Sequence, residues 1–222
     1  MPPPIEEIST YFVNGQFVST ADEQRLAGAV YRLLATGQPA PPHAIATEAG
    51  WPLGDVEERL DGWPAVFRNA DGAVVRFWGL AAEPVARHRM DIDGVGTSWA
   101  WCAYDTLFIT HLLDITTRVT SPCPTTGDEV RLTVSPDGAT DVEPADAVVS
   151  LLMPDKPFDD DVMQTLCHYI HFFASPDAAG RWIDDTPGTF WVPVADAFEV
   201  ARRMNAAVYP ALVGKRAAVD DR

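Results

Sequence analysis

Two cysteines and one aspartate are the residues of this chain whose types and spacing are suited to chemistry. Cys102 and Asp105 stand three positions apart in an apolar, aromatic run, Trp99–Asp114. If that run is helical, residues at i and i+3 share one face, with about 5–6 Å between their Cβ atoms. A thiol beside a carboxyl at this distance is a nucleophile or a soft metal ligand next to a proton carrier.

The local sequence predicts a pKa shift for each member of this pair. A cysteine in the first turn of a helix is expected to have a lowered thiol pKa. Asp105 lies among aromatic residues, so its carboxyl is expected to be buried and to favour the neutral, proton-donating form. The plainer alternative is a core cysteine with an aspartate that solvates the helix end. The aromatic neighbours are Trp99, Trp101, Tyr104 and Phe108.

A second thiol of interest belongs to Cys167. The segment 162–174 ends in a strand-like stretch in which Cys167 and His171 would share one face. Two thiols from separate elements suit a soft ion of low coordination number, because thiolate sulfur selects Cu(I), Zn(II) and, by the same softness, Hg(II). Zinc prefers four ligands, a set that would need His168 or His171 to join. Cys123, between two prolines in a turn, is interpreted as structural.

Composition excludes several classes of protein. The 222 residues are 47% hydrophobic and 10% aromatic, too apolar for a disordered chain. The net charge of −16, with the arginines scattered, argues against binding to nucleic acid or to an anionic membrane. Three cysteines without a C-x-x-C pair indicate neither a disulfide framework nor a zinc ribbon. Without a signal peptide or a membrane-length apolar run, a soluble cytoplasmic protein is expected.

The first third of the chain has the pattern of a winged helix-turn-helix. Residues 1–20 are interpreted as an N-terminal arm, and residues 21–82 as a helix-turn-helix-like domain. DNA binding conflicts with charge, because residues 43–71 carry six acids against two arginines. The expected elements are helices at 22–36, 43–49 and 53–60 and a hairpin turning at Asp71-Gly72.

The remainder, residues 83–222, is predicted to be an α+β catalytic domain that carries the cysteines. The fold class is therefore α+β, with the helical N-terminal domain followed by a mixed or antiparallel β-sheet core and flanking helices. The expected strands are 116–120, 129–135 and 147–153, and the expected helices are 178–184 and 194–207.

Several ordered motifs resemble the bacterial organomercurial (alkylmercury) lyases. The resemblance is strong from about Trp99 to Ser175 and weaker before and after, with a looser match of residues 37–60 to the family's helix-turn-helix-like leader. The matching segments are Trp101-Cys-Ala-Tyr-Asp-Thr-Leu107, Ser121-Pro-Cys-Pro-Thr-Thr-Gly127, Leu132-Thr-Val-Ser-Pro136, Val148-Val-Ser-Leu151 and Cys167-His-Tyr-Ile-His-Phe-Phe-Ala174.

The resemblance implies mercury detoxification: cleavage of a carbon–mercury bond by protonolysis to a hydrocarbon and Hg(II). Cys102 and Cys167 would hold the mercury, Asp105 would complete the site and move the proton, and Cys123 would be structural. No cofactor is implied. The implied partners are an organomercurial, external thiols needed for turnover, and small thiols or a mercuric reductase as the Hg(II) acceptor. The alternative is a non-catalytic soft-metal (Hg or Cu) binding or sensing protein that uses the same thiols.

Overall fold

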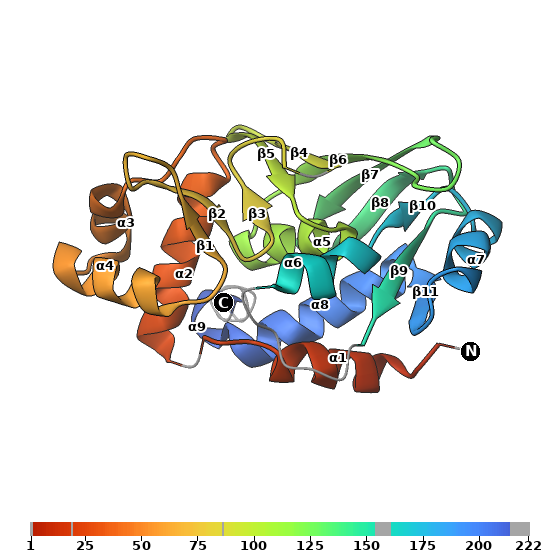
Figure 1. Cartoon of the computed structure of the whole chain (residues 1–222), viewed down its shortest axis with the longest axis horizontal. Helices are drawn as coiled ribbons and strands as arrows, with labels where there is room; N and C mark the ends of the chain where they lie inside the picture. The colour runs from red at the N-terminus through yellow and green to blue at the C-terminus, as the bar shows by residue number, and fades with distance from the viewer. Residues whose placement is uncertain (1, 19, 86, 154–160, 214–222) are drawn as a thin grey trace, which may run out of the picture.

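The computed structural model describes residues 2–18, 20–85, 87–153 and 161–213. The chain forms an α+β fold in which two β-sheets are packed against helices (Figure 1). No helix in these ranges is long and apolar enough to cross a membrane.

Both sheets are antiparallel, one of the two arrangements predicted, a mixed or an antiparallel sheet. The strands of the large sheet are β1 (Val66–Arg68), β2 (Val74–Phe77), β3 (Leu80–Ala81), β4 (His88–Ile92), β5 (Gly96–Ala100), β6 (Thr117–Pro122), β7 (Glu129–Ser135) and β8 (Gly138–Glu143). Their order is β1-β2-β3-β5-β4-β6-β7-β8. The small sheet has the order β10-β9-β11, with β9 (Val148–Leu152), β10 (Phe172–Phe173) and β11 (Thr189–Pro193).

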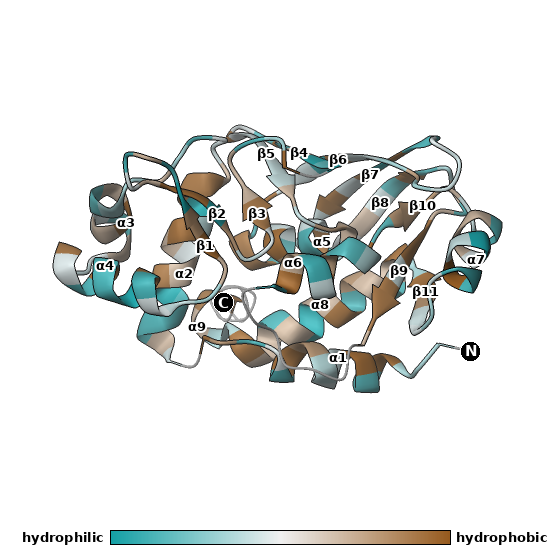
Figure 2. Ribbon diagram, viewed as in Figure 1, coloured by the Kyte–Doolittle hydropathy of each residue, from teal (hydrophilic) through white to brown (hydrophobic). Residues whose placement is uncertain are grey.

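The helices cover the sheets and each other in layers. They are α1 (Ile5–Asn14), α2 (Ala21–Leu34), α3 (Pro42–Ala49), α4 (Leu53–Gly62), α5 (Ala103–Leu113), α6 (Val162–Thr165), the 3-10 turn η1 (Cys167–Tyr169), α7 (Pro176–Asp184), α8 (Val194–Val208) and α9 (Pro210–Val213). Helix α5 contacts the large sheet on one side and α8 on the other, and α1 packs on α8. Apolar and polar residues alternate around α1 and α8, whereas β9 is largely apolar (Figure 2).

Helix α5 is the central element of the fold. Nearly all of its residues are buried, which is expected of a helix that is apolar on every side. It begins later than predicted, because Trp99 and Ala100 pair with β4 and β3 as the end of strand β5. Asp114 ends the helix in the left-handed conformation, with φ of 57°.

The N-terminal third contains the predicted helices and hairpin. Helices α2, α3 and α4 and the β1–β2 hairpin match the expected positions, and Thr20 caps α2 in a reciprocal pair of hydrogen bonds with Glu23. The arm at 1–20 also contains a helix, α1, which buries Ile8 and Phe12. Strands from residues 66–81 join the large sheet, which therefore continues into the residues after 82. The helix-turn-helix assignment and the domain boundaries stay predictions.

The strand predicted around Cys167 is wrong. This segment forms a short helix and a 3-10 turn, and only Phe172–Phe173 pairs as a strand. Apolar side chains at Val162, Leu166 and Ile170 are buried with helix-like spacing, and this burial outweighs the alternating pattern. Cys167 and His171 therefore do not share a strand face.

Candidate active site

The first half of the site is built at the N-terminus of α5. Cys102 is the residue that caps this helix, and Asp105 is the third residue inside it. The backbone N–H of Cys102 donates to Oδ2 of Asp105 at 2.9 Å, and the N–H of Asp105 faces the Cys102 sulfur. This reciprocal arrangement is a capping box in which cysteine and aspartate take the usual places of serine and glutamate. The three-residue spacing therefore fixes thiol and carboxyl side by side.

The second half of the site is Cys167, the first residue of η1. The N–H of Ala103 donates to the carbonyl of Ile170 at 3.1 Å, which ties this segment to the start of α5. Ser150 of β9 fixes it from the other side, because its hydroxyl donates to the carbonyl of Tyr169 at 2.7 Å and accepts from the N–H of His171 at 2.9 Å. These contacts hold Cys167 over the end of α5.

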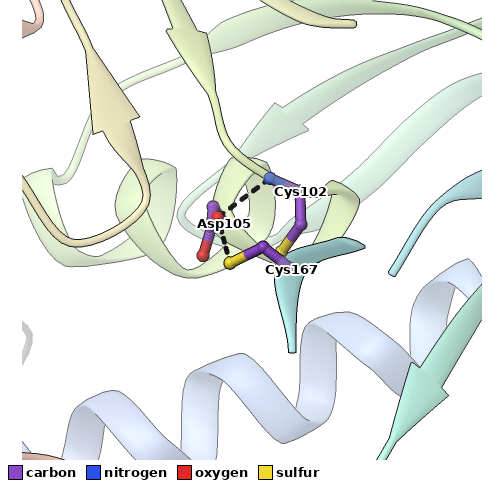
Figure 3. A group of neighbouring side chains, drawn as sticks. All are labelled: Cys102, Asp105 and Cys167. Atoms are coloured by element: carbon purple, nitrogen blue, oxygen red, sulfur yellow. Dashed lines mark hydrogen bonds between the residues drawn. The ribbon is translucent and has the colours of Figure 1, made fainter. Parts of the chain in front are cut away.

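The three predicted site residues converge in one buried cluster. One ligand atom from each of Cys102, Asp105 and Cys167 lies within 4.8 Å of the other two (Figure 3). The Cys167 sulfur donates a long hydrogen bond, 3.9 Å, to Oδ2 of Asp105. Among the described residues this is the one group of three or more side chains placed to hold a metal ion. Two sulfurs and one oxygen form a ligand set that favours a soft ion.

Burial dominates the electrostatics of the cluster. It raises the pKa of Asp105 from 3.8 to about 7, so the carboxyl is a proton carrier at neutral pH, as predicted. Burial also raises the pKa of Cys102 well above its usual value, so the predicted lowering at the helix N-terminus is wrong. A hydrogen bond with Cys102 lowers the pKa of Cys167, but burial and the Asp105 charge together outweigh it and the net shift is upward. Both thiols are therefore protonated until a metal displaces their protons.

Apolar side chains enclose the cluster in a cavity of about 30 Å³. That space has room for about two or three water molecules, since one water needs roughly 10–15 Å³. The walls come from the start of the chain, from the β2–β3 turn and from α5 and α6. They include Phe12, Gln16, Trp78, Gly79, Trp101, Tyr104, Phe108, Val162, Leu166 and Ile170.

The other candidate ligands lie apart from this cluster. In the described part of the chain neither His168 nor His171 joins the thiols, and the His171 ring stacks on His88 with centroids 6.0 Å apart. Cys123 is buried in its loop, where its N–H donates to the carbonyl of Asp128 at 2.8 Å. A four-ligand zinc site is therefore not formed by these residues.

Sequence reasoning identified Trp101, Tyr104 and Phe108 near the site but missed the rest of its walls. Phe12 and Gln16 come from the segment interpreted as an arm, and Trp78 and Gly79 from the turn after the hairpin. A signal for α1 was present, because Ile5, Ile8 and Phe12 recur at helical spacing. The contact between Gly79 and Asp105 left no pattern in the sequence.

Fold and site together define a class of protein. A buried pair of thiols on an α+β scaffold is suited to a soft metal, and a carboxyl with a pKa near 7 beside them is suited to accept or donate a proton. A site that only stored metal would have no need of the proton carrier.

The chain belongs to the alkylmercury lyase family. The family model described as "MerB: Alkylmercury lyase" matches residues 80–206. The alkylmercury lyase of Staphylococcus epidermidis is 39% identical over 200 residues, covering 90% of this chain and 89% of that protein. The alkylmercury lyase of Streptomyces lividans is 38% identical, covering 80% of each chain. The mercury-bound form of MerB2 has a similar fold, with a TM-score of 0.71 and 19% identity over 91% of this chain and 99% of that one.

Proposed function

We propose that this enzyme cleaves the carbon–mercury bond of organomercurials by protonolysis and thereby detoxifies them. Family membership supports the reaction class, a lyase acting on carbon–mercury bonds. The single observation that carries the mechanism is the convergence of Cys102, Asp105 and Cys167 in one buried cavity. The products are a hydrocarbon and Hg(II).

Substrate capture begins with exchange of a ligand on mercury. In R–Hg–X, a thiol of the enzyme displaces X, and the thiol proton leaves with X. The second thiol gives its proton to the Asp105 carboxylate and binds the same mercury. The 4.8 Å limit on the distances between the three ligand atoms makes these exchanges possible with small side-chain movements. Cys102 and Cys167 then both push electron density onto the metal.

Cleavage follows when Asp105 returns that proton to carbon. The carbon–mercury bond breaks, its electron pair takes the proton, and R–H leaves while Hg(II) stays on two thiolates. The raised pKa of Asp105, about 7, suits a group that must first accept and then donate a proton. The apolar walls exclude water and receive the organic group. Because the cavity is little larger than a few water molecules, its wall side chains must move to admit the substrate.

Turnover requires an external acceptor for mercury. Two small thiols, or a thiol-bearing mercuric reductase, take Hg(II) and return the protons to Cys102 and Cys167. The chemistry consumes no electrons, so it calls for no organic or redox cofactor. An acceptor with two sulfurs can replace both of the enzyme's metal–sulfur bonds, so it removes Hg(II) more readily than an acceptor with one sulfur.

We also infer that residues 21–82 serve the catalytic unit, residues 83–222, rather than DNA. The helix-turn-helix-like segment places Trp78 and Gly79 in the wall of the cavity and gives strands to the large sheet. Its acidic helix α4 would repel phosphate. The arm, residues 1–20, contributes Phe12 to the cavity wall, where its ring centroid lies 4.4 Å from that of Tyr104.

The proposed activity is tested with purified protein, excess small thiol and phenylmercury. We expect benzene to accumulate well beyond one equivalent of enzyme, as measured by gas chromatography of the headspace. Tight mercury binding without benzene would contradict the proposal and favour a sequestering or sensing protein. Omission of the thiol is the control, because it should limit benzene to a single turnover.

A further inference from the structure

The backbone of Gly79 lies unusually close to the Asp105 carboxyl. A Cβ atom built on Gly79 would be 2.6 Å from Cγ and from Oδ1 of Asp105 and 3.0 Å from Oδ2. Real Cβ atoms essentially never approach other atoms that closely. The carboxyl therefore occupies the volume that any side chain at position 79 would need, and no such residue fits without displacing it.

The turn that carries Gly79 is held in a conformation that favours glycine. Gly79 has φ of 91°, and Trp78 before it has φ of 31°, an uncommon value for a bulky residue. Three hydrogen bonds keep it there: from the Tyr31 hydroxyl to the Trp78 carbonyl at 2.9 Å, from Trp78 Nε1 to the Pro64 carbonyl at 2.7 Å, and from the Trp101 N–H to the Gly79 carbonyl at 2.8 Å. A strained turn fixed at so many points is typical of a functional site.

The Asp105 carboxyl therefore lies against the rigid backbone of Gly79 and also contacts both thiols. The carboxyl receives an N–H from Cys102 and the Cys167 thiol. The backbone of Gly79 fills the space next to the carboxyl, so the carboxyl cannot rotate in that direction. The bond between Trp101 and Gly79 also joins this turn to the residue that precedes Cys102.

We propose that Gly79 is a positioning residue of the proposed reaction: its bare backbone, held by the Trp78 turn, presses the Asp105 carboxyl against both thiols. This inference rests on the proposed function. Gly79 lines the cavity but has no side chain that could react with mercury or with the organic group, so in this proposal it acts through Asp105. It predicts that the rate of proton transfer depends on position 79, while the stoichiometry of Hg(II) binding by the two thiols does not.

The test compares Gly79→Ala with Gly72→Ala. Gly72 also has a positive φ, 79°, but a Cβ there meets no atom within 4 Å. Both variants therefore carry the backbone penalty of alanine in this region, and only one displaces Asp105. We expect the single-turnover rate of benzene release from bound phenylmercury to fall about 100-fold in Gly79→Ala, since misplacement by 1 Å costs about that much. Gly72→Ala should retain the rate.

Two further readouts separate positioning from general damage. Titration with Hg(II) should still find one equivalent bound tightly to Gly79→Ala, because the thiols remain. The infrared band of the Asp105 carboxyl, assigned by difference against Asp105→Asn, should shift in frequency in Gly79→Ala and stay unchanged in Gly72→Ala, because only the first substitution changes the contacts of this carboxyl. An unchanged cleavage rate in folded Gly79→Ala would overturn the inference, as would equal losses in both glycine variants.

Tyr31→Phe keeps the inference testable if Gly79→Ala fails to fold. This variant removes the hydroxyl that holds the Trp78 carbonyl and that also contacts Tyr209, and it keeps the ring. We expect slower cleavage, about tenfold, with unchanged Hg(II) stoichiometry. A wild-type rate in Tyr31→Phe would contradict the role of the turn. Absence of benzene from the wild-type enzyme would instead defeat the proposed function itself, so the two failures are distinguishable.

Discussion

The two halves of the site are encoded in different ways. Cys102 and Asp105 are brought together by one turn of α5 and its capping box, a feature of four consecutive residues. Cys167 reaches them through η1, which depends on hydrogen bonds to Ala103 and Ser150 from distant parts of the chain. The comparison shows that a local pattern can specify a proton carrier beside a thiol, whereas the second thiol requires the assembled fold.

The largest expected effect comes from removing a thiol from either half. We expect Cys102→Ala and Cys167→Ala each to abolish benzene release, because one sulfur cannot hold mercury and activate its bond to carbon. Cys123→Ala is the matched control, since this buried cysteine lies outside the cluster and its loss should leave cleavage intact. Full turnover by Cys102→Ala would show that the two halves do not act together.

The next largest effect is expected from Asp105, the proton carrier in the half of the site formed by the start of α5. Asp105→Asn keeps the shape and can no longer shuttle a proton, so we expect single-turnover cleavage to fall by about 10²–10⁴-fold. Binding of one equivalent of Hg(II) to the two thiols should persist, as measured by competition with a small thiol. A variant that cleaves at the wild-type rate would assign the proton to another group.

Stability against pH reports on the same carboxyl. The folded state holds the Asp105 proton more tightly than the unfolded chain, because the pKa rises from 3.8 to about 7. The free energy of unfolding therefore falls as pH rises through this window, by at most about 4 kcal/mol from this group. Urea unfolding at about pH 4 and pH 8 should show that Asp105→Asn gains stability relative to wild type at the higher pH. A constant difference would show that Asp105 is not buried as described.

The smallest effect is expected from Ser150, which holds the segment that carries Cys167. Ser150→Ala removes both hydrogen bonds that fix residues 169–171, and we expect it to lower the free energy of unfolding by about 1–3 kcal/mol and to slow cleavage. Ser121→Ala is the matched control, because Ser121 is equally buried and bonds His88, 3.0 Å away, instead. Equal cleavage rates in the two variants would mean that Ser150 does not position Cys167.

Sequence alone predicted what short spacing determines. Helices α7 and α8, strands β7 and β9 and the pairing of Cys102 with Asp105 follow from local periodicity and caps. The strand proposed at Cys167 was wrong, since burial of Val162 and Leu166 decided the local structure. The sign of the Cys102 pKa shift was also wrong, because desolvation inside the assembled core exceeds the effect of the helix N-terminus.

The remaining features depend on packing between distant segments. The Trp78–Gly79 turn meets Asp105 only because the β2–β3 connection and α5 are parts of one core. Short strands such as β3 pair with neighbours that sequence periodicity did not identify. The three residues that converge in the candidate site, in contrast, were proposed from their types and from the resemblance of several ordered motifs.

The most direct test of two thiols and one acid acting as a unit is a single turnover of phenylmercury in heavy water without added thiol. We predict one equivalent of benzene per enzyme, each molecule carrying one deuterium. When the enzyme is then unfolded in denaturant, two of its three thiols should resist alkylation because they hold Hg(II), whereas all three should react in mercury-free enzyme treated in the same way. Benzene without deuterium, or three thiols still open to alkylation after cleavage, would contradict the account.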